Sequence, residues 1–304
     1  MLSWVNFNSN YMNPSRLLRS ACILAVFALL RAVSHAQFTA ITDDFSTTGS
    51  LTGSTPDTGV GNWTNISGTS GAIATSSGSL SLAAAGSTEA TQVNFASSNL
   101  SSGTIYMGFS LNVSSSGSIG TNDSISSIAG FRVGTAVSGS NSFAVGVFRP
   151  STNAQTFSSA PSTTTSQFDI GIFTGTSFNA SSSVLPVWAS ALTRGTTYRV
   201  VLGFDLTNDT ASLWVNPTSV TSTFITYSSV TDAVRGVYLR QGISTTGNIT
   251  IDDLAVSQIF NTAAAVPEPS TYALFGGVAA LSLVFIQRFR SRRVKSATQP
   301  EIVS

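Results

Sequence analysis

Short runs of alternating apolar and polar residues recur through the middle of the chain, and clusters of Gly, Ser and Asn separate them. Alternation with a period of two places the apolar side chains on one face, so each run predicts a half-buried β-strand. Nine strands are expected, at residues 79–83, 104–113, 128–137, 143–149, 168–174, 197–206, 211–215, 235–241 and 248–256. Short strands at regular intervals predict an all-β fold, an antiparallel sandwich of two sheets.

Two local features sharpen this pattern. In the runs at 197–206 and 211–215, apolar residues occupy every second position, and a short polar turn separates the two runs. This arrangement predicts a β-hairpin. In the run at 248–256 the apolar positions switch from odd to even across Asp252 and Asp253. One extra residue in a strand produces such a switch, so a β-bulge is expected at these two aspartates.

Residues 1–36 have the features of a secretory signal peptide. Two arginines precede an apolar run at 21–30, and small residues lead up to Ala36. The run is too short to span the ~30 Å of a bilayer core, so cleavage between Ala36 and Gln37 is expected instead of a permanent anchor. A signal of ordinary length would begin at Met12, so that residue is a second candidate for the start of translation.

The C-terminal segment, residues 261–304, consists of a short linker followed by three parts in a fixed order. The first part is a short motif of Val266, Pro267, Glu268, Pro269 and Ser270. An apolar stretch at 271–287 comes next, and a basic segment at 288–304 contains Arg288, Arg290, Arg292 and Arg293. The two prolines keep the motif extended, and the arginines place the following end of a membrane helix on the cytoplasmic side.

This order of motif, apolar helix and arginine cluster resembles the PEP-CTERM sorting signal of Gram-negative bacteria that produce exopolysaccharide. The resemblance implies an exosortase as partner, a membrane transpeptidase that would process the chain at residues 266–270. The protein would then be held for a time in the inner membrane before it reaches the cell surface or extracellular matrix. An ordinary C-terminal membrane anchor is the alternative.

Charge and composition exclude several classes of function for the central region. The whole chain of 304 residues has a formal net charge of +1, but residues 37–265 contain six arginines, no lysine and eleven acidic residues, a net charge of −5. A surface of this sign repels phosphate backbones, so nucleic-acid binding is not expected. The only Cys and the only His, Cys22 and His35, fall in the signal segment, which leaves the exported part without disulfides, Cys or His zinc ligands, or a Ser-His-Asp triad.

The pattern from residue 43 to residue 256 resembles the laminin-G-like, concanavalin-type jelly-roll domains, and the sandwich is expected to occupy residues 37–260. The resemblance implies that the first and last strands are neighbours, which would bring Asp43 or Asp44 close to Asp252 or Asp253. Carboxylates are the ligands that Ca²⁺ prefers, so Asp44, Asp252 and Asp253 are candidate Ca²⁺ ligands. The alternative is that these aspartates only bind backbone groups of the bulge and turn.

Two functions remain open for the sandwich. The first is a non-catalytic structural or carbohydrate-interacting module, with exopolysaccharide as a partner and no obligatory cofactor. Trp214 has the opposite parity to its strand neighbours, so its indole either stacks on a sugar ring or packs under a loop. The second function is a secreted polysaccharide-degrading enzyme, a glycosidase or lyase, but Glu89 is the only glutamate in residues 37–265.

Overall fold

The structure of the chain is a computed structural model. It describes residues 37–82, 88–117, 125–132, 143–148, 166–174, 177–178, 186–228, 233–241 and 247–265. The expected signal peptide, the motif at 266–270, the apolar stretch and the basic segment lie outside the described residues. Among the described residues, no helix is both long enough and apolar enough to cross a bilayer.

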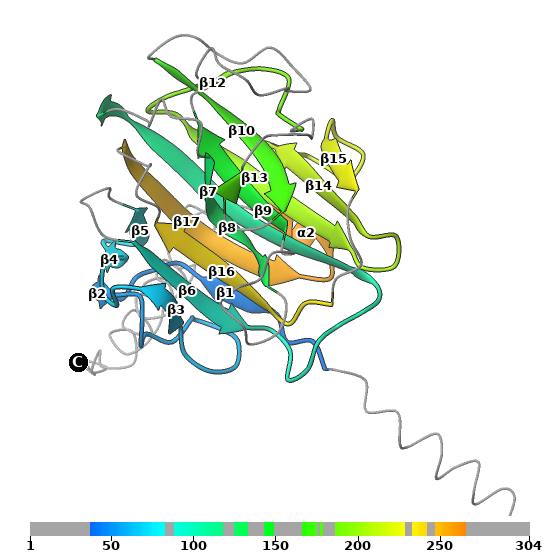
Figure 1. Cartoon of the computed structure of the whole chain (residues 1–304), viewed down its shortest axis with the longest axis horizontal. Coiled ribbons are helices and arrows are strands. Elements are labelled where there is room, and N and C mark those ends of the chain that lie inside the picture. The colour runs from blue at the N-terminus through cyan, green and yellow to red at the C-terminus, as the bar shows by residue number, and fades with distance from the viewer. Residues whose placement is uncertain are drawn as a thin grey trace, which may run out of the picture.

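The described strands form two antiparallel sheets that pack face to face (Figure 1). The larger sheet has nine strands. Its order is β15 (Ile225–Ser228), β14 (Thr210–Val215), β13 (Thr197–Asp205), β7 (Thr104–Gly117), β17 (Gly247–Ser257), β5 (Ser79–Leu82), β4 (Ala74–Ser76) and β2 (Gly49–Ser50), and β1 (Ile41–Asp43) also pairs with β17. All of its neighbouring strands are antiparallel.

The smaller sheet has eight strands among the described residues. Its order is β12 (Leu192–Thr193), β10 (Gln167–Thr174), β9 (Phe143–Phe148), β8 (Ile125–Arg132), β16 (Gly236–Gln241), β6 (Glu89–Asn94) and β3 (Thr64–Gly68), with β11 (Ser177–Phe178) paired to β8. The expected all-β, two-sheet antiparallel sandwich is therefore confirmed. All nine expected strands are present, with shifted ends, and β1, β3, β6 and β15 are among those that the pattern missed.

Apolar side chains from both sheets fill the space between them. Phe131 of β8 meets Phe204 of β13 across the sandwich with ring centroids 6.3 Å apart, and Phe168 of β10 meets Tyr198 of β13 at 6.0 Å. The three phenylalanine side chains are fully buried. Each contributes about 1.5–3 kcal/mol through burial, so these contacts are a main source of the attraction between the sheets.

The first and last strands of the sandwich are neighbours, as the jelly-roll resemblance implies. Ile41 pairs with Val256 and Asp43 with Leu254. The expected bulge in β17 is also confirmed, because the register against β7 shifts between Asp252 and Ala255. β17 pairs with β5 before the bulge and with β1 after it, so the bulge lies where β17 changes its neighbour.

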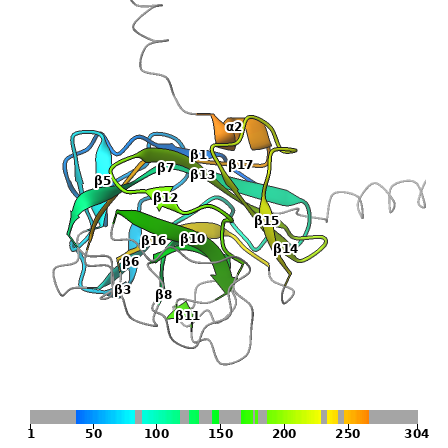
Figure 2. The same cartoon turned by 90° about the horizontal axis from the view of Figure 1, so that it is seen from above.

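A short helix, α2 (Phe260–Ala264), packs on the outer face of the larger sheet, on the side away from the smaller sheet (Figure 2). Gly108 of β7 makes this close approach possible, because a Cβ atom there would lie 1.8 Å from the carbonyl oxygen of Ala263. Arg199 of β13 fixes the arrangement: Nη1 donates to the carbonyl of Asp253 (2.7 Å), and Nη2 donates to the carbonyl of Ala263 (2.6 Å).

Candidate functional site

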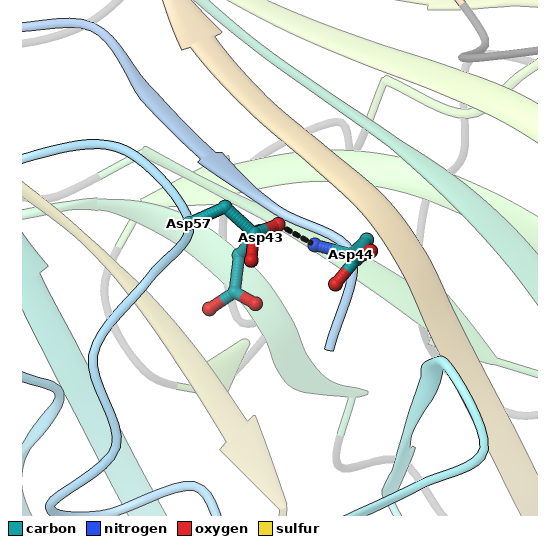
Figure 3. A group of neighbouring side chains, drawn as sticks. All are labelled: Asp43, Asp44 and Asp57. Carbon is teal, nitrogen blue, oxygen red and sulfur yellow. Dashed lines mark hydrogen bonds between the residues drawn. The ribbon is translucent and has the colours of Figure 1, made fainter. Parts of the chain in front are cut away.

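An acidic cluster lies where β1 ends. Asp43, Asp44 and Asp57 each place one carboxylate oxygen so that the three oxygens lie within 4.8 Å of one another (Figure 3). Asp43 and Asp44 come from the end of β1, and Asp57 comes from the connection between β2 and β3. The backbone N–H of Asp44 donates to Oδ2 of Asp57 (2.8 Å), which holds the two segments together.

Asp43 is the buried member of the cluster, and Asp44 and Asp57 are exposed. Both oxygens of Asp43 accept hydrogen bonds, Oδ1 from the N–H of Phe45 (2.9 Å) and Oδ2 from Nε1 of Trp63 (2.7 Å). Burial raises the pKa of Asp43, and the charges of Asp57 and Asp44 raise it further, against the effect of the two hydrogen bonds. A cation at the cluster would offset this repulsion.

The spacing of the cluster fits a Ca²⁺ ion. Ca²⁺ binds oxygen at 2.3–2.6 Å, so two ligand oxygens on one ion can be no more than about 5 Å apart, and the three carboxylates meet that condition. Asp44 and Asp57 are open to solvent, which leaves a route for the ion and room for water ligands. The cluster therefore has the donor chemistry and the spacing for a Ca²⁺ site with one buried and two exposed ligands.

The sequence predicted part of this group. Asp44 is a member, but Asp57 was missed, because it stands alone in a turn-rich connection with no pattern around it. Asp252 lies near the cluster without being one of its three members. Burial raises the pKa of Asp252 to about 6, with further contributions from the charges of Asp253 and Asp44.

The hydrogen bonds of Asp253 connect it to neighbouring residues of the sheet. Its backbone is in the left-handed region at φ 50°, its N–H donates to Oδ1 of Asp252 (2.7 Å), and its Oδ2 accepts from Oγ of Ser110 (3.2 Å). Its carbonyl accepts from Arg199. These contacts match the alternative in which the aspartates satisfy groups of the bulge.

Trp214 is packed beneath α2 and the connection between β14 and β15. Only 4% of the residue is exposed, its ring lies 5.0 Å from that of Phe260 and 5.3 Å from that of Phe224, and its Nε1 donates to the carbonyl of Val220 (3.2 Å). The structure thus leaves no open face of the indole on which a sugar could stack. Of the two alternatives from the sequence, packing under a loop describes Trp214.

A solvent-open cleft of ≈ 470 Å³ lies beside the segment that leads into β1. Its lining residues are Gln37, Thr39, Val60, Asn94, Phe95, Ala96 and Ser97. None of them is charged, and four offer amide or hydroxyl groups. The bridge between Phe38 and Ala96 and the hydrogen bond from the N–H of Thr39 to the carbonyl of Phe95 (2.7 Å) join the two sides of the cleft.

Asn94 lines the cleft, and its Oδ1 lies close to Gly236 of the neighbouring strand β16. Its Oδ1 is buried and has no hydrogen-bond partner. No sequence pattern predicted the cleft, because the residues that line it come from three separate segments and are small polar or apolar types.

Glu89 is 1% exposed and is held by hydrogen bonds on both oxygens. Oε2 accepts from the N–H of Ile73 (2.6 Å), and Oε1 accepts from Thr52 (2.6 Å) and Thr91 (3.1 Å), among other donors. Burial would raise the pKa of Glu89, but the hydrogen bonds from Thr52 and Ile73, with those from Gly71 and Asn65, lower it below its ordinary value. This enclosed carboxylate joins β6 to the β2–β3 and β3–β4 connections.

No protein-family model matches the sequence, and none of the curated proteins does. Several solved structures have a similar sandwich. Peanut lectin, solved with a 9mer peptide, has 12% sequence identity and a TM-score of 0.42 over 73% of this chain and 97% of its own. Lectin II from Ulex europaeus has 12% identity and a TM-score of 0.40 over 72% of this chain and 97% of its own.

An alginate lyase from Alteromonas sp.272 is also similar, with 9% identity and a TM-score of 0.36 over 56% of this chain and 78% of its own. At such identities and TM-scores the likeness describes the arrangement alone, so the function of this chain has to be argued from its own residues.

Proposed function

We propose that the chain is an exported protein of the cell envelope or extracellular matrix of a Gram-negative bacterium, and that its sandwich is a non-catalytic carbohydrate-interacting module. The signal features of residues 1–36 support export. The PEP-CTERM-like segment supports sorting by an exosortase. The described fold supports a self-contained module between these signals, because β1 and β17 pair with each other and bring the two ends of the sandwich together.

The uncharged cleft is the observation that carries the carbohydrate part of the proposal. Its volume lies within the range of small-ligand sites, and its amide and hydroxyl groups suit the hydroxyls of a sugar ring, while the exposed side chain of Val60 offers apolar contact. None of the described residues that line the cleft is charged, and the net charge of −5 for residues 37–265 repels polyanions. The ligand class that fits is therefore a neutral saccharide.

Titration of the purified full-length protein with neutral and uronate-containing oligosaccharides tests this proposal. A Ser97→Trp variant fills the cleft, and a Ser116→Trp variant places the same side chain on the exposed end of β7 as a matched control. We expect neutral saccharides to bind the wild type and Ser116→Trp but not Ser97→Trp. Equal binding by the two variants, or no binding of any neutral saccharide, contradicts the proposal.

Ca²⁺ binding by Asp43, Asp44 and Asp57 forms a second part of the proposal. An ion there would tie the end of β1 to the β2–β3 connection and stabilise the folded state. At a free Ca²⁺ concentration of 100 Kd the gain is about 2.7 kcal/mol, which corresponds to roughly 5–10 °C in Tm for a domain of this size.

The test for the ion compares Tm in Ca²⁺ and in chelator for the wild type, for Asp57→Asn and for a control, Asp209→Asn, outside the cluster. We expect the Ca²⁺-dependent rise in the wild type and the control and its loss in Asp57→Asn. Identical melting curves of the wild type in Ca²⁺ and chelator contradict the site.

The non-catalytic part of the proposal is supported by Glu89. Hydrogen bonds occupy both of its oxygens and it is buried, so it is not placed to donate a proton to a glycosidic oxygen. A reducing-sugar release assay with neutral and acidic polysaccharides tests this part. Release that exceeds that of a heat-denatured sample would favour the alternative, a polysaccharide-degrading enzyme.

Sorting is tested by changing Pro267, Glu268 and Pro269 to alanine. The apolar stretch and the arginines remain, so we expect insertion in the membrane to persist and only processing to fail. In cells with an exosortase, the wild type should lose its C-terminal segment and the variant should keep it. The same mass and the same location for both would contradict sorting.

A further inference from the structure

Exposed apolar side chains gather around α2. Among the described residues, four large apolar residues are exposed, and three of them, Val220 (45%), Phe224 (46%) and Ile259 (65%), adjoin Trp214 or Phe260, the side chains that pack α2 on the sheet. We refer to these three residues as the α2 patch. The fourth, Val60 (65%), belongs to the cleft beside β1.

Buried contacts connect the three residues of the α2 patch. The Phe224 ring lies 5.3 Å from the Trp214 ring, and Trp214 Nε1 donates to the carbonyl of Val220 (3.2 Å). On its other side Trp214 packs on Phe260, 5.0 Å away, and Ile259 directly precedes Phe260 as the N-cap residue of α2. Each residue of the patch is therefore joined to the packed pair of Trp214 and Phe260: Phe224 through its ring, Val220 through its backbone carbonyl, and Ile259 as the chain neighbour of Phe260.

The α2 patch lies where the chain leaves the sandwich. α2 ends with Ala265 as its C-cap, and the motif at 266–270 and the apolar stretch follow at once. Five residues, 266–270, separate Ala265 from the start of the apolar stretch at residue 271, so that start is at most about 22 Å from the end of α2. A compact domain of this size is about 45 Å across. A tether of that length keeps the face that carries α2 toward the membrane.

We propose that the α2 patch contacts the surface of the lipid bilayer while the C-terminal segment anchors the chain. This proposal rests on the membrane anchoring in the proposed function. Contiguous exposed apolar side chains mark interaction sites, and insertion into the interfacial layer of lipid would remove these three from water. The patch has no charged member and residues 37–265 carry a net charge of −5, so contact depends on apolar insertion and is not strengthened by anionic lipid.

Fluorescent labelling of the full-length protein tests the contact. Cys22→Ser removes the one native thiol, and an environment-sensitive dye is attached to Ile259→Cys or Val220→Cys. Val60→Cys is the matched control, because Val60 and Ile259 have the same exposed fraction. Each protein is added to phosphatidylcholine vesicles, and flotation with the vesicles is measured separately from dye emission and from quenching by a water-soluble quencher.

We expect all labelled proteins to float with the vesicles, and the dye at 259 and 220 to shift to shorter wavelength and lose quenching, whereas the dye at 60 does neither. Flotation without a difference between 259 and 60 overturns the patch contact and leaves the anchor intact. Absence of flotation overturns both. A shift at 259 that appears without vesicles and grows with protein concentration overturns lipid contact in favour of a second copy of the chain.

Discussion

Asp252 is expected to destabilise the folded protein at neutral pH, and Asp252→Asn should relieve this. Burial raises its pKa in the folded state to about 6, above the ordinary value of 3.8. The folded state therefore binds the proton more tightly than the unfolded chain, so stability falls as pH rises from about 4 to 6. At 1.36 kcal/mol per pKa unit the full effect is about 3 kcal/mol. Since Asp252 is partly exposed, solvent screening reduces this to about 1–2 kcal/mol.

Asparagine keeps Oδ1 as the acceptor for the N–H of Asp253, so the change removes charge with little change in shape. Urea denaturation at a series of pH values, in chelator, measures the effect. We expect Asp252→Asn to be more stable than the wild type by about 1–2 kcal/mol at pH 8, with the difference vanishing below about pH 4.

Asp205→Asn is a control for which the opposite change in the free energy of unfolding is expected. Hydrogen bonds from Asn208 and Thr207 hold the pKa of Asp205 below its ordinary value, so its charge stabilises the fold above the unfolded pKa, and this contribution is lost as pH falls. Asp205→Asn should thus be less stable than the wild type at pH 8. If Asp252→Asn lowers stability at pH 8, or changes it equally at all pH values, the electrostatic account of the bulge is wrong.

Two further substitutions test the packing. Glu89→Gln should lower the free energy of unfolding by about 2–4 kcal/mol at pH 7, because an amide N–H₂ would face donors that now bind a carboxylate, and urea denaturation would measure it. Gly108→Ala should displace α2, since its Cβ would meet the carbonyl of Ala263, and the emission of Trp214 should then move to longer wavelength. Unchanged emission in Gly108→Ala, or full stability in Glu89→Gln, would contradict these contacts.

Periodicity predicted the sandwich where one face of a strand is apolar and the other is not. It found the β13–β14 hairpin and the bulge in β17, since both leave a parity signal in the sequence. The periodicity did not predict β6. Two residues on its buried face, Glu89 and Thr91, are polar, so the alternation of apolar and polar residues is broken there. The periodicity missed β15 for a different reason: none of the residues of this strand is fully buried.

The candidate site was predictable only where neighbours in sequence are neighbours in space. Asp43 and Asp44 are adjacent in the chain, but Asp57 reaches them through an irregular connection whose path no periodic pattern encodes. The position of Trp214 depended on α2, a five-residue helix without a side-chain cap at its N-terminus. Such a helix has little propensity of its own and exists through tertiary packing, so its sequence carries little signal.

The pairing of β1 with β17 also sets the time at which the sandwich can close. Ile41 and Val256 come from opposite ends of the sandwich, so their pairing is a contact of very long sequence separation, and such contacts form late and slowly. A chain exported from its N-terminus cannot complete the larger sheet until residues 247–257 have emerged, because β17 supplies the edges for β1, β5 and β7. If the chain is exported as proposed, this order of pairing would delay folding of the larger sheet until residues 247–257 have crossed the membrane, and the chain would stay extended while it passes through a narrow export channel.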